Sequence, residues 1–246
     1  MAEPLFDDAA RDQRRQRALR REPRPFLAER IVEEWLERLA PISRRFERAL
    51  VTGVPPALRT RLERVGAAVT FADTIDAIAG EDEASLDLVL VMGELDGRDE
   101  LPLLLRIIAS RLAGGGMLAG ALAGGQSLPA LRAALHVADQ PRGAFPPRSH
   151  PRIEPGALAG LLGDAGLTDA VVDVDQVTLR YRSLDRLIGD LRDHAATNVL
   201  NTRPRTTLGK SGLEAARSAF ARAGDGTATA ERIHLLHYAA WAKRSD

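Results

Sequence analysis

Two residues near the start of the chain have the spacing of a nucleoside-binding site. Gly53 follows the apolar segment 49–51, and Asp73 follows a second apolar segment, 67–72. In nucleotide-binding α/β folds, a glycine after the first strand lets the backbone approach the ligand closely. An acid about 20 residues later, at the end of the second strand, binds the ribose hydroxyls. The spacing is therefore compatible with a ribose contact by Asp73, although acids are common at strand ends.

Apolar segments alternate with helical patterns along the chain, which is typical of an α/β fold. Segment 86–92 is almost entirely apolar, as expected for a strand that is buried on both faces of a parallel sheet. Further strands are expected at 49–51, 67–72, 117–123, 170–181 and 232–241. Helices are expected over most of the first forty residues and at 42–47, 57–65, 100–112, 128–137, 155–165, 184–195 and 212–223, with the glycines at 114–116 ending one of them.

These elements predict a doubly wound, mostly parallel Rossmann-like sheet with an antiparallel last strand and an N-terminal helical arm. The arm is expected at residues 1–48 and a single α/β domain at residues 49–246. In such sheets, ligands bind beyond the carboxyl ends of the strands. Those ends carry Thr52 and Gly53, Asp73, and Met92 and Gly93, which we expect to lie close together.

Composition excludes several classes of protein. The 246 residues include 34 Lys and Arg, 34 Asp and Glu, and no cysteine. Without cysteine there is no disulfide framework, zinc ribbon or thiol nucleophile, and no metal site is expected. The balanced charge argues against a dedicated nucleic-acid-binding protein. No apolar run reaches the ~18 residues that cross a bilayer, so the prediction is a cytoplasmic protein without a membrane span.

The charge is nevertheless distributed unevenly. From Arg11 to Arg24 there are seven arginines and two acids, whereas residues 73–100 hold ten acids and one cation. A solvated helix followed by acidic loops would explain this pattern. The alternative is that the basic arm and the acidic segment face each other or a protein partner.

Several segments have the order and spacing of motifs from a known family. They are Leu86-Asp87-Leu88-Val89-Leu90, Glu100-Leu101-Pro102, Leu112-Ala113-Gly114-Gly115-Gly116, Gly124-Gly125-Gln126-Ser127-Leu128, Asp190-Leu191-Arg192 and Thr197-Asn198. On these residues, the chain resembles the class I S-adenosylmethionine-dependent methyltransferases. Within them it is most similar to the methyltransferase-like complex I assembly factors and their bacterial relatives.

The resemblance implies S-adenosylmethionine as cofactor and transfer of its methyl group to a protein or small-molecule acceptor, or support of arginine hydroxylation. It places the cofactor at the strand ends, with contacts from Thr52, Gly53, Asp73, Met92 and Gly93. Candidates for the substrate pocket are Asp96, Arg132, Arg148, Tyr181 and Asn198, although structural ion pairs and caps would also explain these residues. No catalytic residue is identified.

The sequence departs from the family at the cofactor site. The glycine-rich pattern Asp-x-Gly-x-Gly-x-Gly is replaced by segment 50–56, in which only Gly53 remains and Val54, Pro55 and Pro56 follow. Segment 73–87 is too short for the usual helix and strand, and a family Leu-His-Trp is replaced at 95–97 by Leu-Asp-Gly. Two hypotheses follow: a methyltransferase-family enzyme, or a non-catalytic methyltransferase-like assembly or binding factor.

Overall fold

The structure, a computed structural model, describes residues 3–21, 25–143 and 145–244. Contacts divide the chain into two compact units. We call residues 25–125, 153–175 and 235–246 the sheet unit, and residues 1–24, 126–152 and 176–234 the helical unit. No helix in the described ranges is both long enough and apolar enough to cross a membrane. The expected division at residue 48 stays a prediction.

A six-stranded sheet forms with the strand order β2-β1-β3-β4-β6-β5. The strands are β1 (Arg48–Thr52), β2 (Ala68–Ala72), β3 (Leu86–Met92), β4 (Leu112–Gly124), β5 (Leu167–Tyr181) and β6 (Thr229–Ala242). The first four pair in parallel, and the last two are antiparallel. The predicted Rossmann-like sheet is therefore confirmed, and β3 has the bounds expected from its apolar run.

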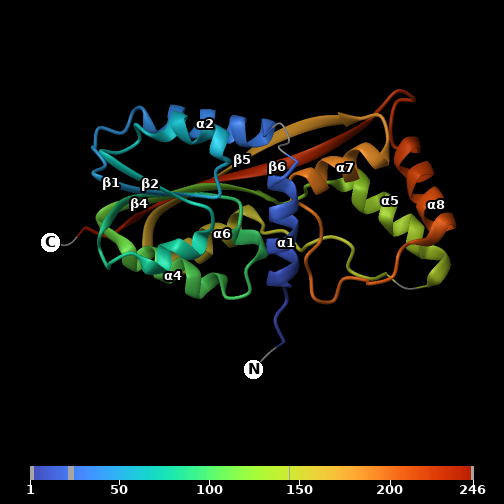
Figure 1. Ribbon diagram of the computed structural model, residues 1–246, viewed down its shortest axis with the longest axis horizontal. Coiled ribbons are helices and arrows are strands. Elements are labelled where there is room, and N and C mark those ends of the chain that lie inside the picture. The colour runs from blue at the N-terminus through green and yellow to red at the C-terminus, as the bar shows by residue number, and fades with distance from the viewer. Residues whose placement is uncertain (1–2, 22–24, 144, 245–246) are drawn as a thin grey trace. The chain divides into compact units, whose positions relative to one another are not determined.

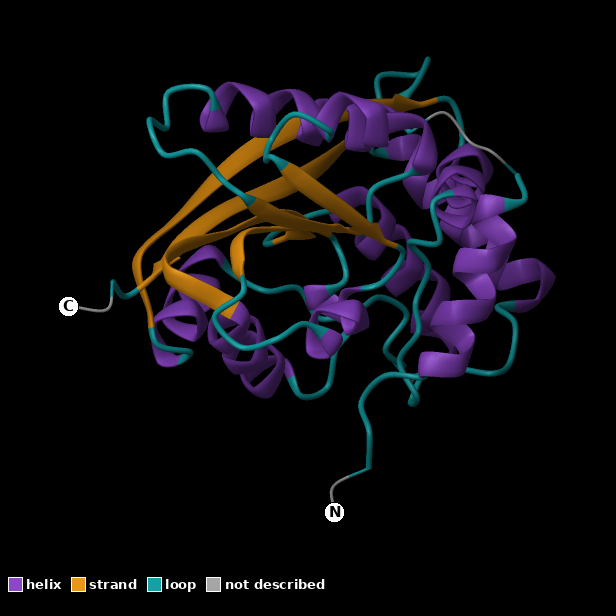
Figure 2. Cartoon of the chain, turned by 60° about the vertical axis from the view of Figure 1, so that its left-hand side comes forward, coloured by secondary structure: helices purple, strands orange, loops and turns teal. Residues whose placement is uncertain are grey.

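Helices in the sheet unit cover both faces of the sheet, with α2 on one side and α4 and α6 on the other (Figure 1 and Figure 2). They are α2 (Phe26–Leu39), α3 (Pro56–Arg59), α4 (Leu101–Arg111) and α6 (Pro155–Asp164), with the 3-10 turns η1 (Thr60–Leu62), η2 (Ile75–Gly80) and η3 (Leu95–Gly97). Ion pairs join α2 to β5: Arg30 to Asp175 at 2.6 Å and Arg38 to Asp173 at 2.5 Å.

The helical unit contains α1 (Asp8–Leu19), α5 (Pro129–Asp139), η4 (Gln140–Arg142), α7 (Leu184–Asp193) and α8 (Gly209–Arg222). Helix α5 packs against α8, and α7 packs against both α8 and α1. Near the N-terminus, Phe6 forms an isolated bridge with Leu200, and both side chains are buried with Val199. These contacts hold the N-terminal segment within its own unit.

Three local predictions were wrong. Residues 42–47 form no helix, and the helix expected at 57–65 is reduced to α3 and η1. The glycines at 114–116 lie inside β4, which begins at Leu112. A Cβ on Gly116 would meet the carbonyl oxygen of Leu86 at 2.9 Å, and the β3–β4 register shifts there. These glycines therefore permit a close approach of two strands at an irregularity, which turn signals alone do not distinguish from a loop.

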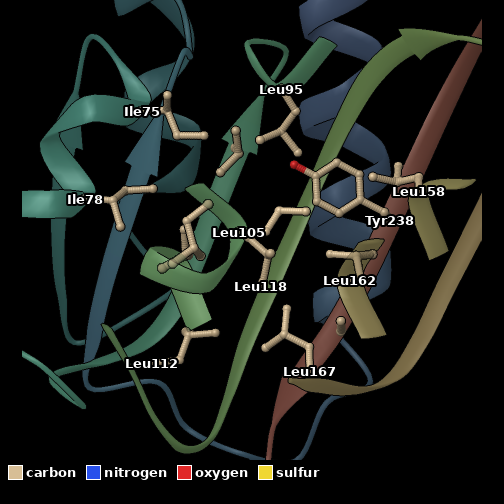
Figure 3. Packing of buried hydrophobic residues seen from close by; sticks show 14 of the residues in the cluster. Ile75, Ile78, Leu95, Leu105, Leu112, Leu118, Leu158, Leu162, Leu167 and Tyr238 are labelled. Carbon is tan, nitrogen blue, oxygen red and sulfur yellow. The ribbon is translucent and has the colours of Figure 1, made fainter. Parts of the chain in front are cut away.

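The core of the sheet unit lies between the sheet and the helices α4 and α6. Leu105 of α4, Leu158 and Leu162 of α6, and Leu118 of β4 are fully buried. Figure 3 shows the ring of Tyr238 from β6 among these leucines. A Cβ on Gly120 would meet the Tyr238 hydroxyl at 2.2 Å, so a glycine on β4 makes room for this ring.

Candidate functional site

The carboxyl ends of the first three strands lie side by side. Thr52, the last residue of β1, is in register with Ala72 on β2 and with Val91 on β3. Asp73 and Met92, one residue beyond those partners, therefore stand at neighbouring strand ends, as the parallel topology requires. The expected gathering of these residues is present. Their role in cofactor binding stays a prediction.

The one remaining glycine of the turn packs against the neighbouring strand. Gly53 has a φ of +75°, and a Cβ on it would lie 2.3 Å from the carbonyl oxygen of Met92. Gly93 has a similar φ of +68°, but a Cβ there would meet nothing within 4 Å. Gly53 is thus required by the contact between the ends of β1 and β3, independently of any ligand.

The rest of that turn lacks the donors of a cofactor loop. Val54 is buried, Pro55 is the N-cap of α3, and Pro56 is the first residue of this helix of four residues. Proline has no N–H, and those are the positions where a longer helix would direct N–H groups at a ligand. The hydroxyl of Thr52 is completely buried and is closed off from the surface. The residues of this turn therefore do not fit the cofactor-binding loop that the resemblance implies.

Acidic side chains at the strand ends bind groups of the chain itself. The Asp73 carboxylate accepts a hydrogen bond from Arg59 at 2.5 Å, and the Arg59 guanidinium also lies over the Phe71 ring. Glu94 accepts a hydrogen bond from the Ile75 amide at 2.5 Å. The ribose contact proposed for Asp73 would therefore compete with an ion pair already formed.

A second arginine pairs with an acid in the same region. Arg98 donates to both carboxylate oxygens of Asp76, at 2.8 and 3.0 Å. The half-buried Asp96 lies in η3, within this acidic segment. Part of the negative charge of segment 73–100 is thus neutralised by arginines of the sheet unit.

The other substrate-pocket candidates lie in the helical unit, and each has a partner there. Arg148 forms a buried pair with Asp139, in which Nη2 lies 2.7 Å from Oδ1. Tyr181 donates to Asp190 at 2.5 Å, and burial together with this hydrogen bond raises the pKa of its hydroxyl. Contact with an acceptor is untested for all of them.

Asn198 and Arg132 make weaker local contacts. The Asn198 amide donates to the carbonyl oxygen of Pro147 at 2.7 Å, and Arg132 donates to the side chain of Gln126 at 3.2 Å. Arg148 and Asn198 line one cavity of about 610 Å³, whereas Arg132 lines a smaller one with Arg148. The structure thus brings together only part of the predicted set.

Glu231 is a buried carboxylate that sequence reasoning did not single out. It is completely buried on β6, and its oxygens accept hydrogen bonds from the amides of Ala130 and Leu131, at 3.2 and 2.8 Å. These amides belong to the first turn of α5, whose N-cap Leu128 provides no side-chain acceptor. Glu231 therefore caps α5 from a distant strand, and no local sequence signal could have assigned it that role.

Comparison with known proteins agrees with this fold. The chain is 34% identical over 117 residues to the mitochondrial arginine-hydroxylase NDUFAF5 of Danio rerio, a match that covers 47% of the chain and 36% of that protein. For the Mus musculus protein of the same name, identity is 32% over 148 residues, covering 58% of the chain and 41% of the relative. The resemblance to methyltransferase-like assembly factors is confirmed. No family profile matches the chain.

Solved structures extend the likeness to nearly the whole methyltransferase-like fold. A putative methyltransferase from Bacillus halodurans C-125 matches with a TM-score of 0.51 at 13% identity, over 85% of this chain and 98% of that one. The YcgJ protein from Bacillus subtilis matches with the same TM-score at 12% identity, over 85% and 97%. At this identity the likeness establishes the fold. The chain matches less than half the length of the NDUFAF5 relatives, so their activity is not transferred with it.

Proposed function

We propose that this protein is a methyltransferase-like factor that binds a partner and does not catalyse methyl transfer from S-adenosylmethionine. The observation that carries the proposal is the contact of Gly53 with the carbonyl oxygen of Met92. The single glycine kept from the cofactor turn serves the packing of two strand ends. Pro55 and Pro56 have no N–H, so this turn also has fewer main-chain donors for a ligand than a glycine-rich loop would have.

The ion pairs of the strand ends support the same conclusion. Asp73 is 72% exposed at its side chain and is paired with Arg59, so a ligand contact by this carboxylate would have to displace an internal ion pair. A fold can persist after its original site has changed, because activity depends on particular side chains and not on the architecture. The related NDUFAF5 proteins are named arginine-hydroxylases, but the strand-end residues of this chain provide no group to which we assign that chemistry.

The partner is proposed to be a protein that contacts the basic helix α1. Arg15 and Arg20 belong to this helix and its C-cap, and neither lines the cavity of the helical unit. Basic side chains of this kind steer acidic partners and increase association rates. The cytoplasmic location expected from the sequence stays a prediction, since the relatives are named mitochondrial.

A second candidate function is methyl transfer to a protein or small molecule. The observation in its favour is the gathering of Thr52, Asp73 and Met92 at adjacent strand ends. If S-adenosylmethionine binds there, it supplies an electrophilic methyl group. The chain's own part would then be to hold the ribose through Asp73 after this carboxylate has left Arg59.

Calorimetric titration with S-adenosylmethionine and S-adenosylhomocysteine separates the two functions. We expect no heat of binding for the wild-type protein up to about 1 mM ligand, and the same for the matched variant Asp73→Asn. Micromolar binding by the wild type that is lost in Asp73→Asn would reject the binding factor and support the enzyme. Circular dichroism of both proteins establishes that they are folded.

The partner surface has its own test. Affinity capture from an extract is compared for the wild type, for Arg15→Gln/Arg20→Gln, and for the control Arg217→Gln, whose exposed side chain on α8 pairs with Asp185. The double variant is expected to lose acidic proteins that the control retains. Identical sets of captured proteins from all three would contradict α1 as the partner surface.

A further inference from the structure

The cavity of about 610 Å³ lies wholly within the helical unit. Its walls come from α1, from the start of α5 and the loop that follows that helix, and from α7 with the segment after it. Figure 1 shows α1 and α7 as neighbouring helices of this unit, and the two are in contact. The volume is in the range of pockets that hold small molecules.

Arginine dominates the polar lining of this cavity. Helix α1 contributes Arg14 and Arg17, which are three residues apart and so share one helix face, and Arg21 follows in the turn after this helix. Arg192 comes from the end of α7, and Arg203 comes from the segment beyond it. No aspartate or glutamate is among the lining residues that the structure describes.

Three of the lining arginines form ion pairs with carboxylates that do not line the cavity. Arg21 pairs with Asp193, and Arg203 pairs with Asp7 at 2.7 Å. Arg148 pairs with Asp139, as described above. These pairs fix the positions of their guanidinium groups.

Three arginines of the lining have no carboxylate partner within hydrogen-bonding distance. Arg14 donates to the main-chain oxygens of Thr197 and Asn198, the first at 2.9 Å. Arg17 and Arg192 are exposed and form no ion pair with any carboxylate in the described part of the chain. The cavity therefore has an excess of positive charge at its edge.

The electrostatic effect on neighbouring groups is consistent with this excess. Burial and the charge of Arg203 lower the pKa of Arg14. His150, which also lines the cavity, has its pKa lowered to about 4 by burial and by the charges of Arg152, Arg14 and Arg11. A doubly charged anion would relieve this repulsion, because guanidinium groups bind phosphate through paired N–H donors.

Another part of the lining is apolar. Leu131 and Leu135 from α5, and Ile188 and Leu191 from α7, contribute their side chains. Leu131 is buried and the other three are half-buried, so a ligand could still cover them. A ligand that contacted both the arginines and these apolar side chains would carry a charged head and an apolar tail.

We propose that this cavity binds a small organic phosphate monoester whose phosphate contacts Arg17 and Arg192 and whose apolar group lies on the leucines of α5 and α7. The proposal goes beyond the partner-binding function and does not depend on the strand ends. A phosphate monoester is favoured over a carboxylate because its charge of about −2 at neutral pH matches two uncompensated guanidinium groups.

Calorimetry with four simple probes tests the proposal. Hexyl phosphate is compared with inorganic phosphate, with heptanoate, which carries one charge, and with hexanol, which carries none. We expect hexyl phosphate to bind at least about tenfold more tightly than each of the others, since the tail and the doubly charged head both contribute. Equal affinities for hexyl phosphate and inorganic phosphate would overturn the apolar half of the proposal.

Variants locate the binding. Arg17→Gln/Arg192→Gln should weaken hexyl phosphate binding about tenfold or more, while the control Arg217→Gln, on α8 and outside the cavity, should bind like the wild type. Leu191→Ser should reduce the advantage of hexyl phosphate over inorganic phosphate. Unchanged binding by the double arginine variant would overturn the site, and thermal melting shows whether each variant is folded. Loss of partner capture in Arg15→Gln/Arg20→Gln has no bearing on this result.

Discussion

The strand ends of the sheet unit and the cavity of the helical unit differ in whether their charged side chains have partners of opposite charge. At the strand ends, Asp73 and Asp76 are each paired with an arginine of the same unit. In the cavity, Arg17 and Arg192 have no such partner among the described residues. The carboxylates near the strand ends are thus compensated within their own unit, whereas the cavity carries uncompensated positive charge.

This difference shows that fold and site can be separated within one chain. The parallel sheet is kept because its core requires it, with Leu118 and Leu105 buried between β4 and α4. The loop at the end of β1 contains two prolines and a close contact between Gly53 and Met92. Function should therefore be sought where charges remain uncompensated.

The largest expected effect concerns the turn at the strand ends. Gly53→Ala should lower the free energy of unfolding by about 4 kcal/mol, because alanine is strained at positive φ and its Cβ would displace the end of β3. Gly93→Ala, with a similar φ but open space around it, should cost only about 1 kcal/mol. Urea denaturation of the two variants measures the difference.

Equal losses of stability in Gly53→Ala and Gly93→Ala would contradict the contrast between the strand ends and the cavity. It would mean that the ends of β1 and β3 separate easily, and that the turn could open for a ligand. The strand ends would then again be a candidate site for the cofactor.

The second prediction concerns the buried ion pair that supports the cavity wall. The side chains of Asp139 and Arg148 are only 3% and 13% exposed. Asp139→Asn should therefore cost about 3 kcal/mol, because it leaves a buried guanidinium without its counter-charge. The exposed pair of Asp185 and Arg217 is the matched control, and Asp185→Asn should have no measurable effect. Thermal or urea unfolding checks both, and similar losses from the two variants would contradict the argument.

The smallest effect depends on pH and on the burial of His150 among the arginines of the helical unit. His150 has a folded-state pKa of about 4, below its value of about 6.5 in the unfolded chain. As the pH falls from 6.5 to 4, the unfolded chain binds a proton at this imidazole and the folded protein does not. Stability is therefore present above pH 6.5 and falls by about 2 kcal/mol over that range, after allowance for partial exposure.

The variant His150→Gln removes this titration while keeping an acceptor for the Val199 amide. The difference in stability between wild type and variant should shrink from pH 7 to pH 4. Urea unfolding at a series of pH values measures it, and a difference that stays constant would show that burial and the nearby arginines do not disfavour the charged imidazole.

Much of the architecture was predictable because it rests on local patterns. The apolar run of β3 and the amphipathic residues of α2, with Ile31, Val32 and Trp35 buried on one face, specify their elements without distant information. The start of β4 was missed because its glycines resemble a turn until Leu86 is placed beside them. The helix at 42–47 was predicted from a short segment, where periodicity is weakest.

The candidate sites were less predictable, because a site depends on which partners reach each side chain. The sequence by itself determined the alternation of strands and helices, the single glycine in segment 50–56 and the surplus of arginine in α1. Only the tertiary structure decided that Gly53 packs against Met92 and that Asp73 is paired with Arg59. It also decided that Arg17 and Arg192, 175 positions apart in the numbering, line the same cavity. Periodicity and composition are properties of neighbouring residues, whereas charge compensation and close packing depend on contacts between distant segments, which form only when the chain folds.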